Sequence, residues 1–172
     1  MARQLSCGVL LRSGDKYLIC HARQFAPPRP YDGKWTIPKG LAEYGERYFE
    51  AALRELKEET GIDLAEFCKK TYTKERGFAF DEAPHGLYMT SSKTVIVYFV
   101  EGPTMMENLT LECKSLIDNK EHPLFNQTEI DDFAWVTAEE GAERVFVSQR
   151  NVFGMFNQDG GYKTSDVWEA RQ

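Results

Sequence analysis

The sequence predicts an α/β domain in which a mixed sheet carries helices on both faces. Apolar runs of strand length lie both before and after an amphipathic helical stretch at residues 46–60, and a second helical stretch follows later in the chain. Elements in this order pack as layers around one hydrophobic core. A chain of 172 residues is long enough to bury such a core without disulfides. We expect one domain over residues 1–157 and a polar tail over residues 158–172.

The first predicted elements are two strands joined by a hairpin. Residues 5–12 and 16–22 are apolar runs, and the Ser-Gly-Asp sequence between them is a turn signal. Residues 23–38 contain four prolines and an Asp-Gly pair. Because these residues interrupt regular structure, this stretch is predicted to be a loop.

The central helix is predicted over residues 46–60. Phe49, Leu53 and Leu56 recur at helical spacing and form an apolar face. Gly61 follows directly and is suited to end the helix, because glycine readily adopts the left-handed conformation.

The second half of the chain adds the remaining layers. Residues 71–80, 93–100 and 131–136 are expected to form strands, the second of them buried because it contains the run Val-Ile-Val-Tyr-Phe. A helix is expected from residue 138 towards residue 156. Residues 105–128 give mixed signals, and no element is predicted there.

The charge of the chain limits its partners. Its net charge is −6, and residues 40–62 hold six acidic and three basic side chains, so they supply half of it. Tight binding of a long polyanion depends on many Lys and Arg contacts. The acidic balance therefore argues against extended nucleic-acid binding, while a small phosphorylated ligand remains compatible with it.

The apolar segments are short. No stretch reaches the length of a membrane span, and the N-terminal run at residues 7–11 is too short for a signal peptide. The four cysteines show no paired spacing, which favours reduced thiols over a disulfide framework or a cysteine metal site. We expect a cytoplasmic protein without a membrane partner. The sequence does not decide between a monomer and a homodimer.

A cluster of glutamates on the central helix indicates metal chemistry. Glu55, Glu58 and Glu59 are three or four residues apart and share one helix face, with Arg54 beside them. Like charges at this spacing cost about 0.2–0.5 kcal/mol per pair, and the helix dipole disfavours anions near the C-terminus. A segment that breaks two local rules is better explained by function than by stability. Carboxylate oxygens suit Mg²⁺ or Mn²⁺, so a divalent cation would resolve the conflict.

A longer pattern surrounds these glutamates. From Gly40 the chain reads Gly, five residues, Glu46, seven residues, then Arg54-Glu55-Leu56-Lys57-Glu58-Glu59-Thr60-Gly61-Ile62. An acidic helix face alone is most often solvated surface, but this many fixed identities are not expected by chance. The segment resembles the Nudix box of the Nudix hydrolases at every position. The resemblance implies the family's α/β/α sandwich and the hydrolysis of a nucleoside diphosphate linked to another group, X.

The resemblance also implies roles for individual residues. Glu55, Glu58 and Glu59 are the expected metal ligands, and Glu55 is also a candidate for deprotonating the attacking water. The backbone carbonyl of Lys39 or Gly40 would complete the coordination.

Further residues are expected to support these ligands. Arg54 and Glu46 resemble the pair that braces the loop against the helix in this family and thereby orients the ligands. A general base often lies outside the box. Glu129 is the leading candidate because it lies just before the predicted strand 131–136, where several members of this family carry such an acid. Asp131 and Asp132 are nearby competitors, and any one of the three acids could instead be a solvated loop residue.

The residues before the box bear on the identity of X. The lead-in Trp-Thr-Ile-Pro-Lys-Gly is similar to that of many dinucleoside polyphosphate hydrolases and some RNA-decapping relatives. Lys39 would supply a point charge for a phosphate chain, and Trp35 would either stack on a base or belong to the core. Phe78 and Phe80 lie where such hydrolases commonly carry a tyrosine, and phenylalanine keeps the stacking face without the hydroxyl.

The predicted substrate is therefore a dinucleoside polyphosphate or a similar small nucleotide. The enzymatic alternatives are ADP-ribose-type compounds and RNA 5′ ends, although Gly77 stands where many ADP-ribose pyrophosphatases carry a proline. A nucleotide-binding sensor without catalysis is a further alternative, and the complete set of acids in the box argues against it. The isolated histidines His21, His85 and His122 are expected to be structural or on the surface, with His85 as a candidate substrate contact.

Overall fold

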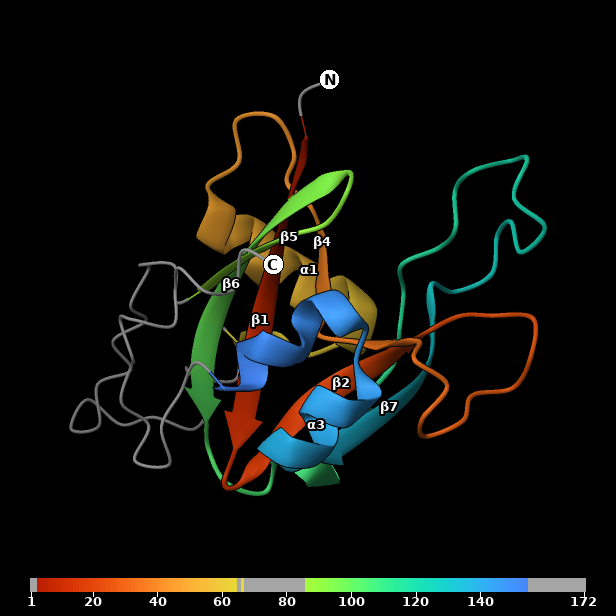
Figure 1. Ribbon diagram of the computed structural model, residues 1–172. Coiled ribbons are helices and arrows are strands. Elements are labelled where there is room, and N and C mark those ends of the chain that lie inside the picture. Colours follow the sequence, from red (N-terminus) through yellow and green to blue (C-terminus); the bar gives the residue numbers. More distant parts are fainter. Residues whose placement is uncertain (1–2, 65, 67–85, 155–172) are drawn as a thin grey trace.

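The computed structural model describes residues 3–64, 66 and 86–154 (Figure 1). The elements in chain order are β1 (Gln4–Ser13), β2 (Lys16–Ala22), β3 (Trp35–Thr36), β4 (Lys39–Leu41), α1 (Tyr48–Thr60), β5 (Gly86–Met89), β6 (Lys93–Gly102), the 3-10 helix η1 (Met106–Asn108), β7 (Ile130–Val136), α3 (Ala138–Arg144) and the 3-10 helix η2 (Val147–Gly154). The predicted α/β class is confirmed. None of the helices in these described ranges is both long and apolar enough to span a membrane.

The sheet is mixed and consists of two connected halves. β1 pairs in parallel with β6 along its whole length, and β6 pairs antiparallel with β5. On its other edge, β1 pairs with β4 near its start and with β2 only at the hairpin. β2 in turn is flanked by β7 on one edge and by β3 on the other. β1 and β2 therefore separate as they leave their hairpin (Figure 1), and β3 and β4 occupy the space between them.

Alternating strand residues build one core on each face of the sheet. Val9 and Leu11 of β1 share a cluster with Leu56 of α1. Leu10, between them, shares a cluster with Val152 of η2 on the opposite face. The sheet consequently lies between α1 on one side and α3 with η2 on the other, which is the predicted three-layer arrangement.

α1 begins two residues later than predicted. Arg47 is still extended (φ −70°, ψ 143°), and the Glu46 carboxylate accepts the backbone N–H of Glu43, so Glu46 belongs to the loop. The predicted end is confirmed: Gly61 has φ 81° and donates its N–H to the Lys57 carbonyl.

The predicted helix over residues 138–156 is wrong in its extent. α3 ends at Arg144, and Val145 is extended (φ −72°, ψ 164°). Val145 forms an isolated parallel bridge with Trp35, and the Phe146 N–H donates to the Trp35 carbonyl at 2.9 Å. These tertiary contacts break the helix, and the chain continues as η2.

The predictions for four further segments have different outcomes. The predicted loop over residues 23–38 contains the short strand β3, which pairs with Cys20 and His21 of β2. The predicted strand at residues 71–80 and the tail at residues 158–172 lie outside the described residues. Residues 105–128, for which no element was predicted, contain η1 and an isolated bridge between Leu116 and Thr128.

Candidate functional site

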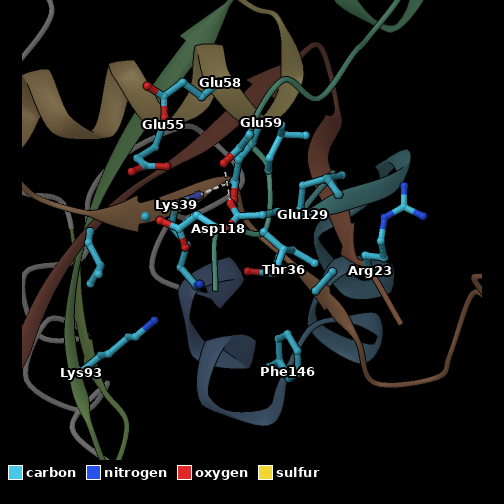
Figure 2. A pocket seen from close by; sticks show the side chains of 17 residues that line it. Arg23, Thr36, Lys39, Glu55, Glu58, Glu59, Lys93, Asp118, Glu129 and Phe146 are labelled. Atoms are coloured by element: carbon cyan, nitrogen blue, oxygen red, sulfur yellow. Dashed lines mark hydrogen bonds between the residues drawn. The ribbon is translucent and has the colours of Figure 1, made fainter. Parts of the chain in front are cut away.

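A pocket of about 480 Å³ opens beside the C-terminal half of α1, between the two halves of the sheet. Its charged lining residues are Arg23, Lys39, Glu55, Glu58, Glu59, Lys93, Asp118 and Glu129. Figure 2 shows the glutamates of α1 on one side of the pocket and Lys93 and Phe146 on the opposite side. The pocket thus combines a carboxylate wall with cationic side chains, an arrangement that suits a phosphate chain accompanied by a cation.

The three helix glutamates differ in their surroundings. Glu55 and Glu59 are buried, whereas the Glu58 side chain is 44% exposed. Burial raises the pKa of Glu59 well above its ordinary value, although the charge of Lys39 and a hydrogen bond from the Lys39 N–H (2.8 Å) oppose the shift. Burial also raises the pKa of Glu55. Two neighbouring buried carboxylates of this kind are costly to ionise without a compensating cation.

Arg54 connects the loop before α1 to this carboxylate wall. Its guanidinium donates two hydrogen bonds to Glu46 (2.8 and 3.0 Å) and one to the Leu41 carbonyl (2.9 Å). It also donates to Glu55 at 2.8 Å and to Glu58 at 3.3 Å. The hydrogen bonds from Arg54 lower the pKa of Glu46, and those to Glu46 raise the pKa of Arg54. The predicted Arg54–Glu46 pair therefore exists, and Arg54 also contacts Glu55 and Glu58 directly.

The donors in this pocket fit a hard divalent cation by their chemistry. Five carboxylates line the same space, those of Glu55, Glu58, Glu59, Asp118 and Glu129. Carboxylate oxygens are the ligands that Mg²⁺ and Mn²⁺ prefer. In the part of the chain that the structure describes, no three His, Cys, Asp or Glu side chains already form a metal-holding group. Instead, Arg54 engages two of these carboxylates and the Lys39 N–H engages a third.

The two candidate backbone ligands lie at the edge of the pocket, which Lys39 and Gly40 both line. The Gly40 carbonyl already accepts the Ser6 hydroxyl at 2.8 Å. A carbonyl oxygen has a second lone pair, so this contact leaves it able to accept another partner.

Among the three acids considered as a general base, only Glu129 lines the pocket. Ser115 donates its hydroxyl to Glu129 at 2.6 Å. Asp131 instead binds the buried ring of His21 at 2.5 Å, and Asp132 is exposed and accepts the N–H of Phe133. The side chains of Asp131 and Asp132 therefore form their hydrogen bonds outside the pocket.

Trp35 belongs to the core rather than to the pocket. It is 2% exposed, its indole N–H donates to the Arg29 carbonyl at 2.7 Å, and the Arg144 guanidinium lies 4.2 Å from its ring centroid. Thr36, the next residue of β3, lines the pocket instead. Successive strand side chains point to opposite faces, so Trp35 is turned away, and the expectation that it contacts substrate is not supported.

Several pocket residues were missed by the sequence analysis. Arg23, Lys93, Asp118 and Phe146 line the pocket but come from four separate segments without a local motif. The periodicity of each segment describes only its own element, so no sequence signal could bring the four together. Asp118 falls within the stretch for which no prediction was made.

The remaining candidates are two phenylalanines and three histidines. Phe78, Phe80 and His85 are outside the described residues. His21 is completely buried in β2 between two aspartates, and His122 is on the surface and accepts the N–H of Leu124 at 3.0 Å. The structural and surface roles expected for these two histidines agree with their positions.

Comparisons with known proteins point to one family. The model of the NUDIX domain matches residues 2–154. Over 52 residues the chain is 48% identical to Nudix hydrolase 10 of Arabidopsis thaliana, an alignment that covers 27% of this chain and 18% of that protein. The chain thus matches less than a fifth of the length of this relative.

Solved structures resemble the fold over most of the chain. An Ap4A hydrolase of C. elegans is 19% identical with a TM-score of 0.56, covering 87% of this chain and 92% of the other. A MutT protein of Methanosarcina mazei Go1 is 21% identical with a TM-score of 0.56 (88% and 91% covered). The E. coli dihydroneopterin triphosphate pyrophosphohydrolase is 19% identical with a TM-score of 0.56 (91% and 97% covered). At these identities the likeness concerns the fold.

Proposed function

The chain belongs to the NUDIX domain family, and on this premise we propose that it is a metal-dependent pyrophosphohydrolase. It would cleave the phosphate chain of a nucleoside diphosphate linked to a second group. The observation that carries the proposal is the pocket in which Glu55, Glu58, Glu59 and Glu129 face the cationic residues Lys39 and Lys93.

The carboxylates of the pocket would hold Mg²⁺ or Mn²⁺. When bound, such a cation neutralises charge on the phosphate oxygens and makes an attacking water more acidic. Glu55, Glu58 and Glu59 would be the side-chain ligands, with the carbonyl of Lys39 or Gly40 as a backbone ligand. The burial of Glu55 and Glu59 supports this assignment, because a cation would offset the cost of two ionised carboxylates there.

The other residues of the site would act on the substrate and the water. Arg54 would orient Glu55 and Glu58 through the hydrogen bonds that it already makes. Glu129 would accept the proton of the attacking water, since it is the candidate outside the Nudix box that lines the pocket, while Glu55, the candidate within the box, is engaged by Arg54. Lys39 and Lys93 would neutralise charge on the phosphate chain in the transition state.

We propose a dinucleoside polyphosphate, or a similar small nucleotide, as the substrate. The Pro38-Lys39-Gly40 lead-in supports this choice. So does the pocket, which combines cationic side chains with the aromatic ring of Phe146 and can therefore accept both a phosphate chain and a base. One structural neighbour is an Ap4A hydrolase, which makes that class of compound a reasonable first candidate.

A substrate panel tests this proposal. Diadenosine polyphosphates, ADP-ribose, nucleoside triphosphates and 5′-triphosphorylated RNA would be incubated with Mg²⁺ or Mn²⁺, with EDTA as the blank, and the products separated by chromatography. We expect metal-dependent cleavage, fastest with a diadenosine polyphosphate. Much faster turnover of ADP-ribose or of RNA 5′ ends would replace the proposed substrate with one of the two alternatives. Nucleotide binding without turnover of any compound would favour a sensor.

A further inference from the structure

A serine outside the Nudix box contacts the candidate base. The Ser115 hydroxyl donates to Oε2 of Glu129 at 2.6 Å, and both residues line the pocket. Ser115 lies 14 residues before Glu129, in a stretch for which the sequence suggested no element. A hydroxyl that donates to a carboxylate forms one of the stronger kinds of hydrogen bond, because the acceptor is charged.

The backbone around Ser115 is anchored to the end of α1. The N–H groups of Lys114 and Ser115 both donate to the Glu58 carbonyl, at 2.7 and 3.2 Å. Glu112 donates its N–H to the Thr60 carbonyl at 3.0 Å. These donors satisfy carbonyls that a helix leaves unpaired in its last turn. Residues 112–115 are therefore fixed relative to the helix that carries the three glutamates.

Ser115 also binds Glu129 through the backbone. The Glu129 N–H donates to the Ser115 carbonyl at 2.9 Å, and the pairing continues at the bridge between Leu116 and Thr128. Ser115 thus makes one backbone contact to the glutamate helix and two contacts to Glu129, one of them with its side chain. Within the described residues, the Ser115 hydroxyl is the side-chain group that hydrogen-bonds the Glu129 carboxylate.

Charge repulsion explains why the Glu129 carboxylate needs a hydrogen bond to keep its position. Glu129 shares the pocket with Glu55, Glu58 and Glu59, and like charges at close range repel each other. A free glutamate side chain in this position would turn towards solvent. The hydrogen bond from Ser115 opposes this movement and restricts the rotation of the carboxylate.

We propose that Ser115 is a positioning residue that fixes the orientation of the Glu129 carboxylate relative to Glu55, Glu58 and Glu59 of α1. This inference rests on the proposed function, in which Glu129 accepts the proton of the attacking water. Ser115 itself makes no bond to the reacting atoms and acts through Glu129.

Kinetics of Ser115 variants test the inference. Ser115→Ala should lower kcat by about 10- to 100-fold with little change in KM, as is typical when a residue that orients a catalytic group is removed. Ser115→Thr keeps the hydroxyl and should restore most of the rate. Ser148→Ala is the control, because Ser148 lies in η2 and is not among the pocket residues. A Ser115→Thr variant as slow as Ser115→Ala would overturn the inference.

A double-mutant comparison separates positioning from a general structural effect. In a Glu129→Gln background, Ser115→Ala should cause no further loss of kcat, because the group that it positions has already been disabled. If the two losses multiply, Ser115 does not act through Glu129 and the inference fails. A Glu129→Gln variant with the full wild-type rate would instead contradict the assignment of Glu129 as the base.

A second measurement does not depend on turnover. In the metal-free protein, the carboxyl ¹³C resonance of Glu129, identified by its loss in Glu129→Gln, should shift or broaden in Ser115→Ala and return in Ser115→Thr. An unchanged resonance would overturn the positioning role whether or not a substrate is known. A changed resonance in a protein without hydrolase activity would support the positioning role and count against the proposed function alone.

Discussion

The α-carbon of Gly40 lies directly against the carboxyl group of Glu55, and a β-carbon at position 40 would overlap that carboxyl group. The contact joins β4 to α1 at the point where the pocket opens. Glu55 is 7% exposed there and accepts its hydrogen bond from Arg54. Position 40, at the start of the box, therefore has no room for a side chain larger than that of glycine.

Replacement of Gly40 tests this contact. Gly40→Ala should displace the Glu55 carboxylate, lower the rate of hydrolysis at least 10-fold and cost about 1–3 kcal/mol of unfolding free energy through overpacking. Gly154→Ala is the matched control, since a β-carbon there meets no atom of the described residues within 4 Å. Turnover and urea unfolding of both variants would be compared. Full activity of Gly40→Ala would contradict the proposed role of Glu55.

Lysine at position 54 is predicted not to support the full rate of hydrolysis. Lysine cannot reproduce the fork that binds both oxygens of Glu46 while contacting Glu55. We expect Arg54→Lys to lower kcat by about 10- to 100-fold. Arg47→Lys changes an exposed ion pair between the residue that precedes α1 and Glu50 of the helix and should leave the rate unchanged. Equal rates for the two variants would show that charge alone is sufficient at position 54.

The buried Glu59 should make the stability of the metal-free protein depend on pH. Burial raises its folded-state pKa above the unfolded value of about 4.3. Its contribution to stability is therefore fully present below that unfolded value and is lost as the pH rises towards the raised folded pKa. Glu59→Gln removes this loss, so the variant should gain at least about 1 kcal/mol relative to wild type between pH 5 and pH 8.

Urea unfolding at both pH values, with EDTA and with Mg²⁺, measures this effect. Mg²⁺ should stabilise the wild-type protein at pH 8 and have a much smaller effect on Glu59→Gln, because a ligand that binds only the folded state stabilises it. If the two proteins changed stability in parallel from pH 5 to pH 8, the burial of Glu59 would not have the predicted consequence.

His21 is predicted to be important for stability rather than for chemistry. Its ring is fully buried, with Nδ1 at 2.5 Å from Asp131 and Nε2 at 2.8 Å from Asp32. Asp32 also accepts the N–H groups of Arg29 and Lys34, which fixes the loop between β2 and β3. His21→Leu would leave two carboxylates without this partner and should cost about 3–5 kcal/mol.

The comparison for this variant is His122→Leu on the surface, which should change stability by less than about 0.5 kcal/mol. Chemical denaturation of both proteins provides the measurement. Similar stabilities would mean that the two aspartates find other partners when the His21 ring is removed.

The sequence predicted the elements that local residue patterns determine, and it missed the changes in backbone structure that tertiary contacts cause. The helical spacing of Phe49 and Leu56 and the stop at Gly61 describe α1 by themselves, so the glutamates were placed correctly on it. Val145 continues a helical pattern in the sequence, but its bridge to Trp35 makes it extended.

The pocket residues could likewise be predicted only where the partners lie close together in the sequence. Glu46 and Arg54 were paired from the box alone, because both partners lie within one motif. The Ser115–Glu129 contact joins two positions of an irregular segment, and Lys93 reaches the pocket only because β6 pairs in parallel with β1. Neither placement leaves a periodic signal in the sequence.

The central claim is that the carboxylates of α1 bind a divalent cation that is essential for cleavage of a phosphate chain. The most direct measurement is the initial rate of diadenosine polyphosphate hydrolysis by wild type and Glu58→Gln as a function of Mg²⁺ concentration. The Glu58 side chain is half-exposed, so the substitution should preserve the fold. We predict a wild-type rate that is abolished by EDTA and a loss of at least about 100-fold in Glu58→Gln. A metal-independent wild-type rate, or equal rates for the two proteins, would contradict the account.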